Sequence, residues 1–257
     1  MRYGVLAPGK RLRPLLMLVT AHALGADQDD LLDVACAVEL VHAASLFLDD
    51  LPCMDDAGLR RGQPTVHIAF GEDVATLASV ALLATAWRLT ADTPQVTAAA
   101  RLQMVTVLAD AVGLDGLVGG QYRDLHASGA ESISAVQVVN HKKTSVLFEA
   151  VFDIACLAAG SGPETRSQLR SAAAELGQAF QLLDDLLDRE LESKETGKDS
   201  NQDSGKPTLV ALLGPKLARQ KLKDHVESAN RWMQQAMPFD HSAVMLTNSI
   251  FAKSGLQ

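Results

Sequence analysis

The sequence predicts an all-α protein folded as one domain. Hydrophobic residues make up 47% of the chain and aromatic residues only 4%. Alanine and leucine dominate the apolar set, a composition that favours helices. Apolar residues recur at helical spacing almost throughout, and no alternating strand pattern is present. The 257 residues contain no linker-like stretch, so we expect a single domain over residues 1–257.

Glycine and proline residues divide the periodic pattern into helices. One helix delivers Asp49 at its carboxyl end, and its apolar face carries Leu31, Val34, Val38, Val41, Ser45 and Leu48. Further helices are predicted near residues 14–24, 73–90, 95–112, 115–127, 132–159, 164–190 and 215–236. The breaks between them fall at Gly25, Gly71, Pro94, Gly113, the run from Gly160 to Pro163, and Pro215. The polar stretch from Glu190 to Lys206 is predicted to be a loop.

The bulk composition argues against several classes of protein. A net charge of −8 excludes general nucleic-acid binding. The three cysteines, Cys36, Cys53 and Cys156, give neither a disulfide framework nor zinc-ligand spacing, which is typical of a reduced intracellular protein. Neither a run of roughly eighteen uncharged apolar residues nor a signal peptide is visible, so we expect no membrane span and a cytoplasmic location.

Two aspartate clusters stand far apart in the chain, each embedded in an apolar helical stretch. The first is Asp49-Asp50-Leu51-Pro52-Cys53-Met54-Asp55-Asp56, and the second is Asp184-Asp185-Leu186-Leu187-Asp188. Grouped carboxylates repel one another and are costly to bury, and a divalent cation removes both costs. Magnesium is typically held by one or two carboxylates together with substrate phosphates. Two such clusters facing each other would therefore form a diphosphate site.

The second cluster fits a regular helix. Asp184 and Asp188 are four residues apart and share a face, with Asp185 at its flank. The residues about one or two turns earlier are Gln181, Gln178 and Gly177. We therefore expect a small, partly polar wall below the carboxylates, as an internal cavity requires.

The first cluster does not fit a regular helix. Asp49 and Asp55 are six residues apart, which places them about 240° apart around an ideal helix. Pro52 would interrupt the helix, because proline lacks a backbone donor and clashes with the preceding turn. We expect Pro52 and Cys53 to form a turn that returns Asp55 to the side of Asp49. An unbroken helix through residues 49–56 would refute this.

A magnesium-bound diphosphate still carries charge that lysine and arginine side chains would balance. Candidate residues occur at four places: Lys10 with Arg13, Arg60 with Arg61 and His67, Lys143 with Thr144, and Lys198 with Lys206. Each basic motif alone would be interpreted as an ordinary solvated surface. Their occurrence together with two aspartate clusters favours a diphosphate site.

Six motifs occur in an order that resembles the trans-type (head-to-tail) isoprenyl diphosphate synthases. They are GKRLRP at 9–14, ELVHAASLFLDDLPCMDDAGLRRGQPTVH at 39–67, GGQYRDL at 119–125, KTSVLFEA at 143–150, GQAFQLLDDLLD at 177–188 and TGKDSNQDSGKPTLV at 196–210. The resemblance spans essentially the whole chain. The segment HAASLFLDDLPCMDDAGLRRGQPTVH is most similar to bacterial geranylgeranyl diphosphate synthases of carotenoid pathways.

The resemblance implies the isoprenoid synthase type I fold, a helical bundle around a deep central cavity, and a homodimer. It implies magnesium, three ions per active site with substrate bound, on Asp49, Asp50, Asp55, Asp184, Asp185 and Asp188. It assigns the allylic diphosphate to Arg60, Lys143, Lys198 and Lys206. It assigns isopentenyl diphosphate to Lys10, Arg13, Arg61 and His67. The implied catalytic residues are Lys143, Thr144 and Gln181, the last two facing the developing carbocation.

The implied reaction needs no side-chain nucleophile. The allylic diphosphate departs, the double bond of isopentenyl diphosphate attacks the resulting cation, and a proton passes to the released diphosphate. This agrees with the sequence, in which no Ser-His-Asp or Cys-His arrangement is evident. Family members carry more chain before the GKRLRP motif, so we expect this chain to lack an N-terminal segment.

Product length is expected to depend on Ala44 and Ser45, which lie about one turn beneath Asp49 and would form the cavity floor. Both are small, and relatives that stop at fifteen carbons often have an aromatic residue at the position of Ala44. We therefore expect a twenty-carbon product, geranylgeranyl diphosphate. Leu82, Leu83 and Val118 are alternative floor residues.

Four other functions stay open at this point: a farnesyl diphosphate synthase, a terpene cyclase, a catalytically silent binding subunit and a plain helical scaffold. A terpene cyclase would not need the basic residues Lys10, Arg13 and His67. The intact acidic clusters argue against a silent subunit. A scaffold would bind neither magnesium nor diphosphate.

Overall fold

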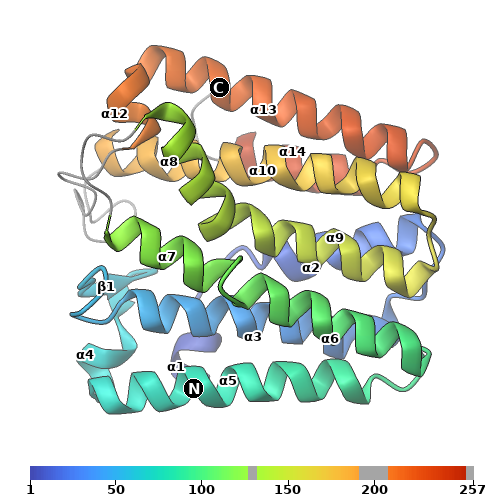
Figure 1. The fold of residues 1–257 in the computed structure, drawn as a ribbon, viewed down its shortest axis with the longest axis horizontal. Helices are drawn as coiled ribbons and strands as arrows, with labels where there is room; N and C mark the ends of the chain where they lie inside the picture. Colours follow the sequence, from blue (N-terminus) through green and yellow to red (C-terminus); the bar gives the residue numbers. More distant parts are fainter. Residues whose placement is uncertain (127–131, 191–207, 253–257) are drawn as a thin grey trace.

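The computed structural model shows a bundle of long helices that run roughly side by side (Figure 1). It describes residues 1–126, 132–190 and 208–252. The helices are α1 (Arg2–Val5), α2 (Leu12–Ala23), η1 (Asp29–Leu31), α3 (Leu32–Asp49), α4 (Val66–Phe70), α5 (Glu72–Asp92), α6 (Ala98–Val112), α7 (Leu117–Leu125), α8 (Ile133–Asn140), η2 (His141–Ser145), α9 (Val146–Ala159), α10 (Pro163–Glu190), α12 (Leu209–Leu213), α13 (Pro215–Ala236) and α14 (Ser242–Ala252). The strands are β1 (Leu59–Arg60) and β2 (Gln63–Pro64).

The predicted all-α class is confirmed, and the long helices lie close to their predicted bounds. Three features differ from the prediction. The stretch predicted as one helix over 132–159 is divided by η2, a π-helix. The C-terminal helix α14 was not predicted. The antiparallel β1–β2 hairpin was also not predicted, because strands of two residues are too short to show alternation.

The helix ends follow from local chemistry. Thr97 and Ser132 cap α6 and α8 by accepting hydrogen bonds from the backbone N–H groups of Ala100 and Ala135. Gly160 ends α9 in the left-handed conformation, with φ 62°, which costs glycine little. Each cap fixes where a long helix begins or ends.

The core lies where α10 packs against α9 and α13 and where α2 packs against α9. Its largest fully buried side chains include Phe148 and Phe152 of α9 and Leu176 of α10. A second, smaller cluster joins α3 to α5 and contains Ala44 and Leu82. The two clusters hold the ends of α3 and α10, which carry the aspartates, in one bundle.

Three helical stretches are long and apolar enough to cross a membrane by length and composition alone: Asp29–Asp49, Glu72–Asp92 and Ala98–Leu125. This corrects the sequence argument, which required an uncharged run and so missed stretches that contain a few charges. Of the three apolar windows, the first is 56% buried inside the bundle, the second 33% and the third 22%. The apolar surface left uncovered therefore lies on α5, α6 and α7.

Candidate active site

The first aspartate cluster lies at the carboxyl end of α3, where the helix stops at Asp49. The next residues form turns, in which the N–H of Met54 donates to the carbonyl of Leu51 at 2.9 Å. The N–H of Asp55 donates to the carbonyl of Asp49, also at 2.9 Å. The predicted interruption beside Pro52 is thus confirmed, and it returns Asp55 to the side of Asp49.

Two cations from distant parts of the chain reach this cluster. Arg60, in the β1–β2 hairpin, donates from Nε and Nη2 to Asp50 Oδ1 at 2.9 and 2.5 Å. The hairpin turns through Arg61 and Gly62, both with positive φ, which matches the twist of a two-residue hairpin loop. The Nζ of Lys143 lies 2.8 Å from Asp124 Oδ2 and 3.8 Å from Asp55 Oδ2.

The charges in this cluster are not balanced evenly. Burial raises the pKa of Asp49 to about 6; Lys143 and Arg60 oppose the shift, and Asp55 and Asp50 add to it. Burial disfavours the charge on Lys143, but Asp124, Asp55 and Asp49 outweigh it and raise the pKa of that amine. Asp49 is therefore a carboxylate short of positive charge, beside a lysine that stays protonated.

The second cluster lies near the carboxyl end of α10. Asp184 is exposed, whereas Asp185 is only 3% exposed and accepts a hydrogen bond from Gln181 Nε2 at 2.7 Å. The hydroxyl of Thr144 donates to Gln181 Oε1 at 3.3 Å. Lys143 and Thr144 are adjacent in η2, so this segment contacts the first cluster directly and the second cluster through one amide.

The two clusters also influence the same cations. The negative charge of Asp184 raises the pKa of both Arg13 and Arg60. Asp184 therefore lies within electrostatic reach of the guanidinium that is paired with Asp50. Asp188, one turn further along α10, is half-buried.

The residues assigned to isopentenyl diphosphate gather beside the first cluster. A Cβ added at Gly9, the residue before Lys10, would lie 2.7 Å from Arg61 Nη1, so this loop runs against Arg61. The Arg13 guanidinium stands 4.6 Å from the centre of the Phe148 ring. Burial, and to a smaller extent Arg61, lowers the pKa of Arg13 to about 10 although Glu39 and Asp184 oppose the shift.

His67 completes this group from α4. It is buried, its Nδ1 lies 3.1 Å from Thr65 Oγ1, and its charge lowers the pKa of Asp50. His42, which sequence reasoning treated as structural, faces the same arginines. Burial and the charges of Arg13 and Arg61 hold its pKa well below the ordinary value. A neutral imidazole therefore lies among these cations.

A pocket opens on this side of the first cluster. It encloses about 410 Å³ of empty space including solvent at its mouth, and Asp50, Arg60 and Arg61 line it together with residues of α1 and α3. The pocket is bounded by the allylic and isopentenyl candidates. A deep cavity between the two acidic clusters stays a prediction.

The predicted cavity wall below the second cluster is wrong at Gly177. A Cβ added there would lie 2.6 Å from the Cα of Ser145, so η2 fills the space beside this glycine. Gln178 likewise donates to the carbonyl of Gln137 in α8, at 3.1 Å. Close helix packing, rather than a cavity, explains the small residue here.

The floor candidates differ in their surroundings. Ala44 is fully buried and packs with Leu82 of α5 in the smaller cluster. Ser45 is half-buried and donates to the carbonyl of His42 at 2.9 Å. Leu83 packs partly buried beside both clusters. Val118 is 52% exposed, which does not fit a buried floor.

Two residues of α7 were missed as site residues by sequence reasoning. Asp124 pairs with Lys143, and Gln121 has both amide atoms buried without a hydrogen-bond partner in the described part of the chain. Their signal was the GGQYRDL motif, in which an amide and a carboxylate three residues apart share a helix face. A buried amide with no partner fits a site that receives a polar ligand.

The donor set fits magnesium held jointly with substrate. Among residues 1–126, 132–188 and 208–252, the structure gathers no three His, Cys, Asp or Glu side chains closely enough to hold a metal ion by themselves. Asp49 and Asp55 lie together, and Asp49 is short of positive charge. Oxygen donors of this kind suit magnesium that also binds phosphate. Lys198 and Lys206 lie outside the described residues.

Comparison with known proteins places this geometry in context. A family model described as polyprenyl synthetase matches residues 1–237. A geranylgeranyl diphosphate synthase of Pantoea ananas is 49% identical over 98% of this chain and 84% of its own length. One from Pseudescherichia vulneris is 53% identical over 93% of this chain and 78% of its own. The crystal structure of a Helicobacter pylori geranyltransferase, complexed with magnesium and isoprenyl diphosphate, is similar with a TM-score of 0.90 and 28% identity, covering 98% of this chain and 86% of that one.

Proposed function

Because the chain belongs to the polyprenyl synthetase family, we propose that it is a head-to-tail prenyltransferase that makes geranylgeranyl diphosphate. Its substrates are isopentenyl diphosphate and allylic diphosphates, and residues 1–257 act as one domain. The observation that carries the proposal is the position of η2. Lys143 lies 3.8 Å from Asp55, and Thr144 connects through Gln181 to Asp185. Two relatives that share about half their residues with this chain bear the name of this activity.

The first step breaks the allylic C–O bond, and its electron pair leaves with the diphosphate. Magnesium bound with substrate by Asp49, Asp50, Asp55, Asp184, Asp185 and Asp188 supplies Lewis-acid stabilisation of that leaving group. Arg60 and Lys143, with Lys198 and Lys206, add fixed positive charge where negative charge develops. Arg60 is held in place by Asp50 before substrate arrives, so little reorganisation is needed.

The second step forms a carbon–carbon bond between the allylic cation and the double bond of isopentenyl diphosphate. Lys10, Arg13, Arg61 and His67 hold its diphosphate group. Arg13 and Arg61 lower each other's affinity for protons through repulsion, and a bound dianion relieves that repulsion. A proton then leaves the new chain for the released diphosphate.

One assay tests the function. Purified protein, magnesium and labelled isopentenyl diphosphate are incubated with dimethylallyl, geranyl or farnesyl diphosphate, and product lengths are measured. We expect twenty-carbon product. A fifteen-carbon end product would identify a farnesyl diphosphate synthase, and a cyclic hydrocarbon from an allylic substrate alone would identify a terpene cyclase. A protein that shows no turnover would be a binding subunit if magnesium and diphosphate raise its melting temperature, and a scaffold if they do not.

The floor assignment has its own test. Ala44 is fully buried against Leu82, so a tyrosine there must project into neighbouring space. We expect Ala44→Tyr to shorten the product to fifteen carbons, and Ser45→Tyr to have a similar but weaker effect. Val118→Tyr, at an exposed position, is the control and should leave product length unchanged. An unchanged product from Ala44→Tyr would show that the floor lies elsewhere.

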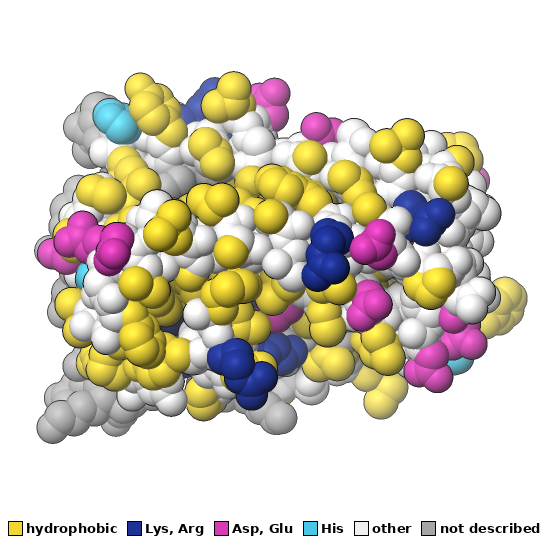
Figure 2. Space-filling view, turned by 90° about the horizontal axis from the view of Figure 1, so that it is seen from below, with side chains coloured by type: hydrophobic (Ala, Val, Ile, Leu, Met, Phe, Trp, Pro, Cys, Tyr) yellow, Lys and Arg dark blue, Asp and Glu magenta, His cyan; other side chains and the backbone are white. Residues whose placement is uncertain are grey.

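A second copy of the chain is the proposed partner. Figure 2 shows hydrophobic side chains spread over the α5 side of the bundle. The exposed ones include Leu77, Val80 and Leu102, which are 68%, 60% and 69% exposed. Apolar surface of this extent marks an interface. We expect light scattering to give the mass of a dimer and Leu77→Glu with Val80→Glu to give a monomer. A wild-type monomer that binds lipid vesicles would overturn this proposal.

A further inference from the structure

The segment η2 departs from ordinary helix at the point where Lys143 and Thr144 enter the site. A π-turn adds one residue to the helical path, is rare, and is found mostly at functional sites. Closing it to regular α-helix would rotate the residues on one side by about 100° relative to the other. Lys143 and Thr144 could then not both keep their present contacts. Something outside η2 must therefore hold it in this form.

Gly177 of α10 lies against one side of η2. A Cβ at this position would lie 2.6 Å from the Cα of Ser145 and closer still to its Oγ. These distances are shorter than carbon atoms tolerate without movement of the backbone. Gly177 stands in the middle of α10, where alanine would be the better helix former by about 1 kcal/mol. Helix formation therefore does not explain this glycine, and the close approach to η2 does.

Gly120 of α7 lies against η2 on another side. A Cβ there would lie 2.7 Å from the backbone N of Lys143 and 2.8 Å from the backbone C of Lys142. The atoms that would collide are main-chain atoms, which cannot move away as a flexible side chain can. Two separate helices thus approach the same five-residue segment, each through a glycine.

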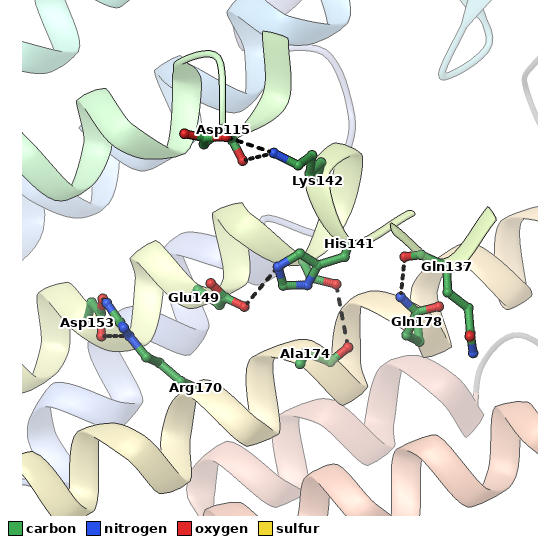
Figure 3. A network of polar contacts seen from close by, with 10 residues as sticks. Asp115, Gln137, His141, Lys142, Glu149, Asp153, Arg170, Ala174 and Gln178 are labelled. Atoms are coloured by element: carbon green, nitrogen blue, oxygen red, sulfur yellow. Dashed lines mark hydrogen bonds and ion pairs between the residues drawn. The ribbon is translucent and has the colours of Figure 1, made fainter. Parts of the chain in front are cut away.

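Side chains hold the same segment from outside the site, as Figure 3 shows. Lys142 donates to the carbonyl and to Oδ1 of Asp115 at 3.0 and 3.2 Å. His141 Nε2 lies 3.5 Å from Glu149 Oε1, and Ser145 Oγ lies 3.5 Å from the carbonyl of Ala174. These contacts are partly exposed or long, so they support the position of η2 less strictly than the two backbone approaches do.

We infer that Gly120 and Gly177 are positioning residues, which let α7 and α10 close on η2 and thereby set where Lys143 and Thr144 stand. The inference rests on the proposed function for its kinetic consequence. Misplacing a catalytic group by about 1 Å can cost about 100-fold in rate. Lys143 belongs to the allylic subsite, while the isopentenyl residues lie on α2, α4 and the hairpin. A shift of η2 should therefore affect one substrate more than the other.

The test compares Gly177→Ala with Gly162→Ala, a control glycine with no atom within 4 Å of its added Cβ. We expect Gly177→Ala to lower kcat at least about tenfold and to raise KM for the allylic diphosphate, with KM for isopentenyl diphosphate within about twofold of wild type. In metal-free protein, hydrogen exchange across residues 141–145 should become faster. Gly162→Ala should change neither quantity.

Rescue gives the sharper readout. Ser145→Gly removes the Oγ and Cβ that an alanine at 177 would meet, so the double variant should recover part of the lost kcat and slow the exchange again. Should Gly177→Ala fail to fold, recovery of folding in the double variant supports the inference and its absence overturns it. Kinetics and exchange of Gly177→Ala within about twofold of Gly162→Ala would also overturn it. If the wild-type protein elongates no substrate, the proposed function fails while the exchange comparison still tests the two glycines.

Discussion

Two buried aspartates of this molecule, Asp49 and Asp153, show how the same side chain serves a site or a scaffold. Asp153, in α9, is 3% exposed and accepts hydrogen bonds from Arg166 Nε and Nη2 at 2.7 and 2.9 Å and from Arg170 Nη2 at 2.5 Å. Figure 3 shows the Arg170 contact at one end of the network. Burial alone would raise the pKa of Asp153, but the two arginines overcome it and hold that pKa below the ordinary value. Asp49 is shifted in the opposite direction, to about 6.

The difference lies in the supply of positive charge. Asp153 has two guanidinium partners within the fold, so its carboxylate is satisfied without a ligand. Asp49 has Lys143 and Arg60 nearby, but they are paired more closely with Asp124 and Asp50. A buried carboxylate whose cations are committed elsewhere destabilises the fold until another cation arrives. The comparison teaches that the direction of the shift separates binding aspartates from structural ones here.

The largest effect is expected from Asp49→Asn. It should lower kcat/KM by about 1000-fold, because a negative charge is removed where cations must be held. The same change should raise the stability of the metal-free protein by about 1–2 kcal/mol, because a costly buried charge is lost. Steady-state kinetics and urea unfolding measure the two effects. Asp56→Asn, at an exposed neighbour, is the control. A destabilised Asp49→Asn protein would break the comparison.

Asp153→Asn should have the opposite profile. Losing one partner of a buried ion pair costs about 3–5 kcal/mol, and we expect about 2–4 kcal/mol here because the Arg170 side chain is 53% exposed. Turnover at a temperature where the variant stays folded should remain within about threefold of wild type. Urea midpoints and the prenyl transfer assay provide the two readouts. A large loss of turnover in folded protein would assign Asp153 to the site.

The pH dependence of stability should differ in sign between the two residues. For Asp153, whose folded pKa is lowered, the stability gained relative to Asp153→Asn is full above about pH 4 and is lost as pH falls through that lowered pKa. For Asp49, whose folded pKa is about 6, the penalty relative to Asp49→Asn is absent below about pH 4 and full above about pH 6. Urea midpoints of metal-free protein from pH 3 to 8, on about half-unit steps, test both. Parallel curves would contradict the assignment.

The smallest effect is expected from Arg166→Lys. Arg166 contacts both oxygens of Asp153 with a planar fork that an ammonium cannot reproduce. The charge is kept, so the loss should be about 1 kcal/mol. Thermal unfolding of this variant beside Asp153→Asn separates the geometry of the pair from its charge. Equal losses in the two variants would show that geometry matters as much as charge.

The sequence predicted the parts of the site that depend on local geometry. Helix period places Asp184 and Asp188 on one face, and Pro52 beside Asp49 requires a turn, so both clusters could be described before the structure. The long helices followed from periodicity and their breaks from glycine and proline. The resemblance supplied Lys143, Thr144 and Gln181, and the structure brings these three together between the clusters.

What the sequence did not predict depends on contacts between distant segments. Gly177 was interpreted as part of a cavity wall because its neighbour Ser145 is 32 positions earlier in the printed chain. Asp153 drew no attention, although an acid inside the apolar run VLFEAVFDIACLAA had to find a cation somewhere. The arginines that satisfy it lie on the next helix. The π-turn of η2 has no periodic signal, since it inserts one residue into an otherwise regular pattern.

The bond between Thr144 and Gln181 has a consequence for polarity. A hydroxyl has one hydrogen to give, and that of Thr144 is already given to the amide oxygen of Gln181. The amide's nitrogen is in turn directed at Asp185. Toward anything else nearby, Thr144 can therefore offer only lone pairs. A threonine held this way presents a weakly electron-rich surface that would welcome an electron-poor carbon and discourage an additional anion.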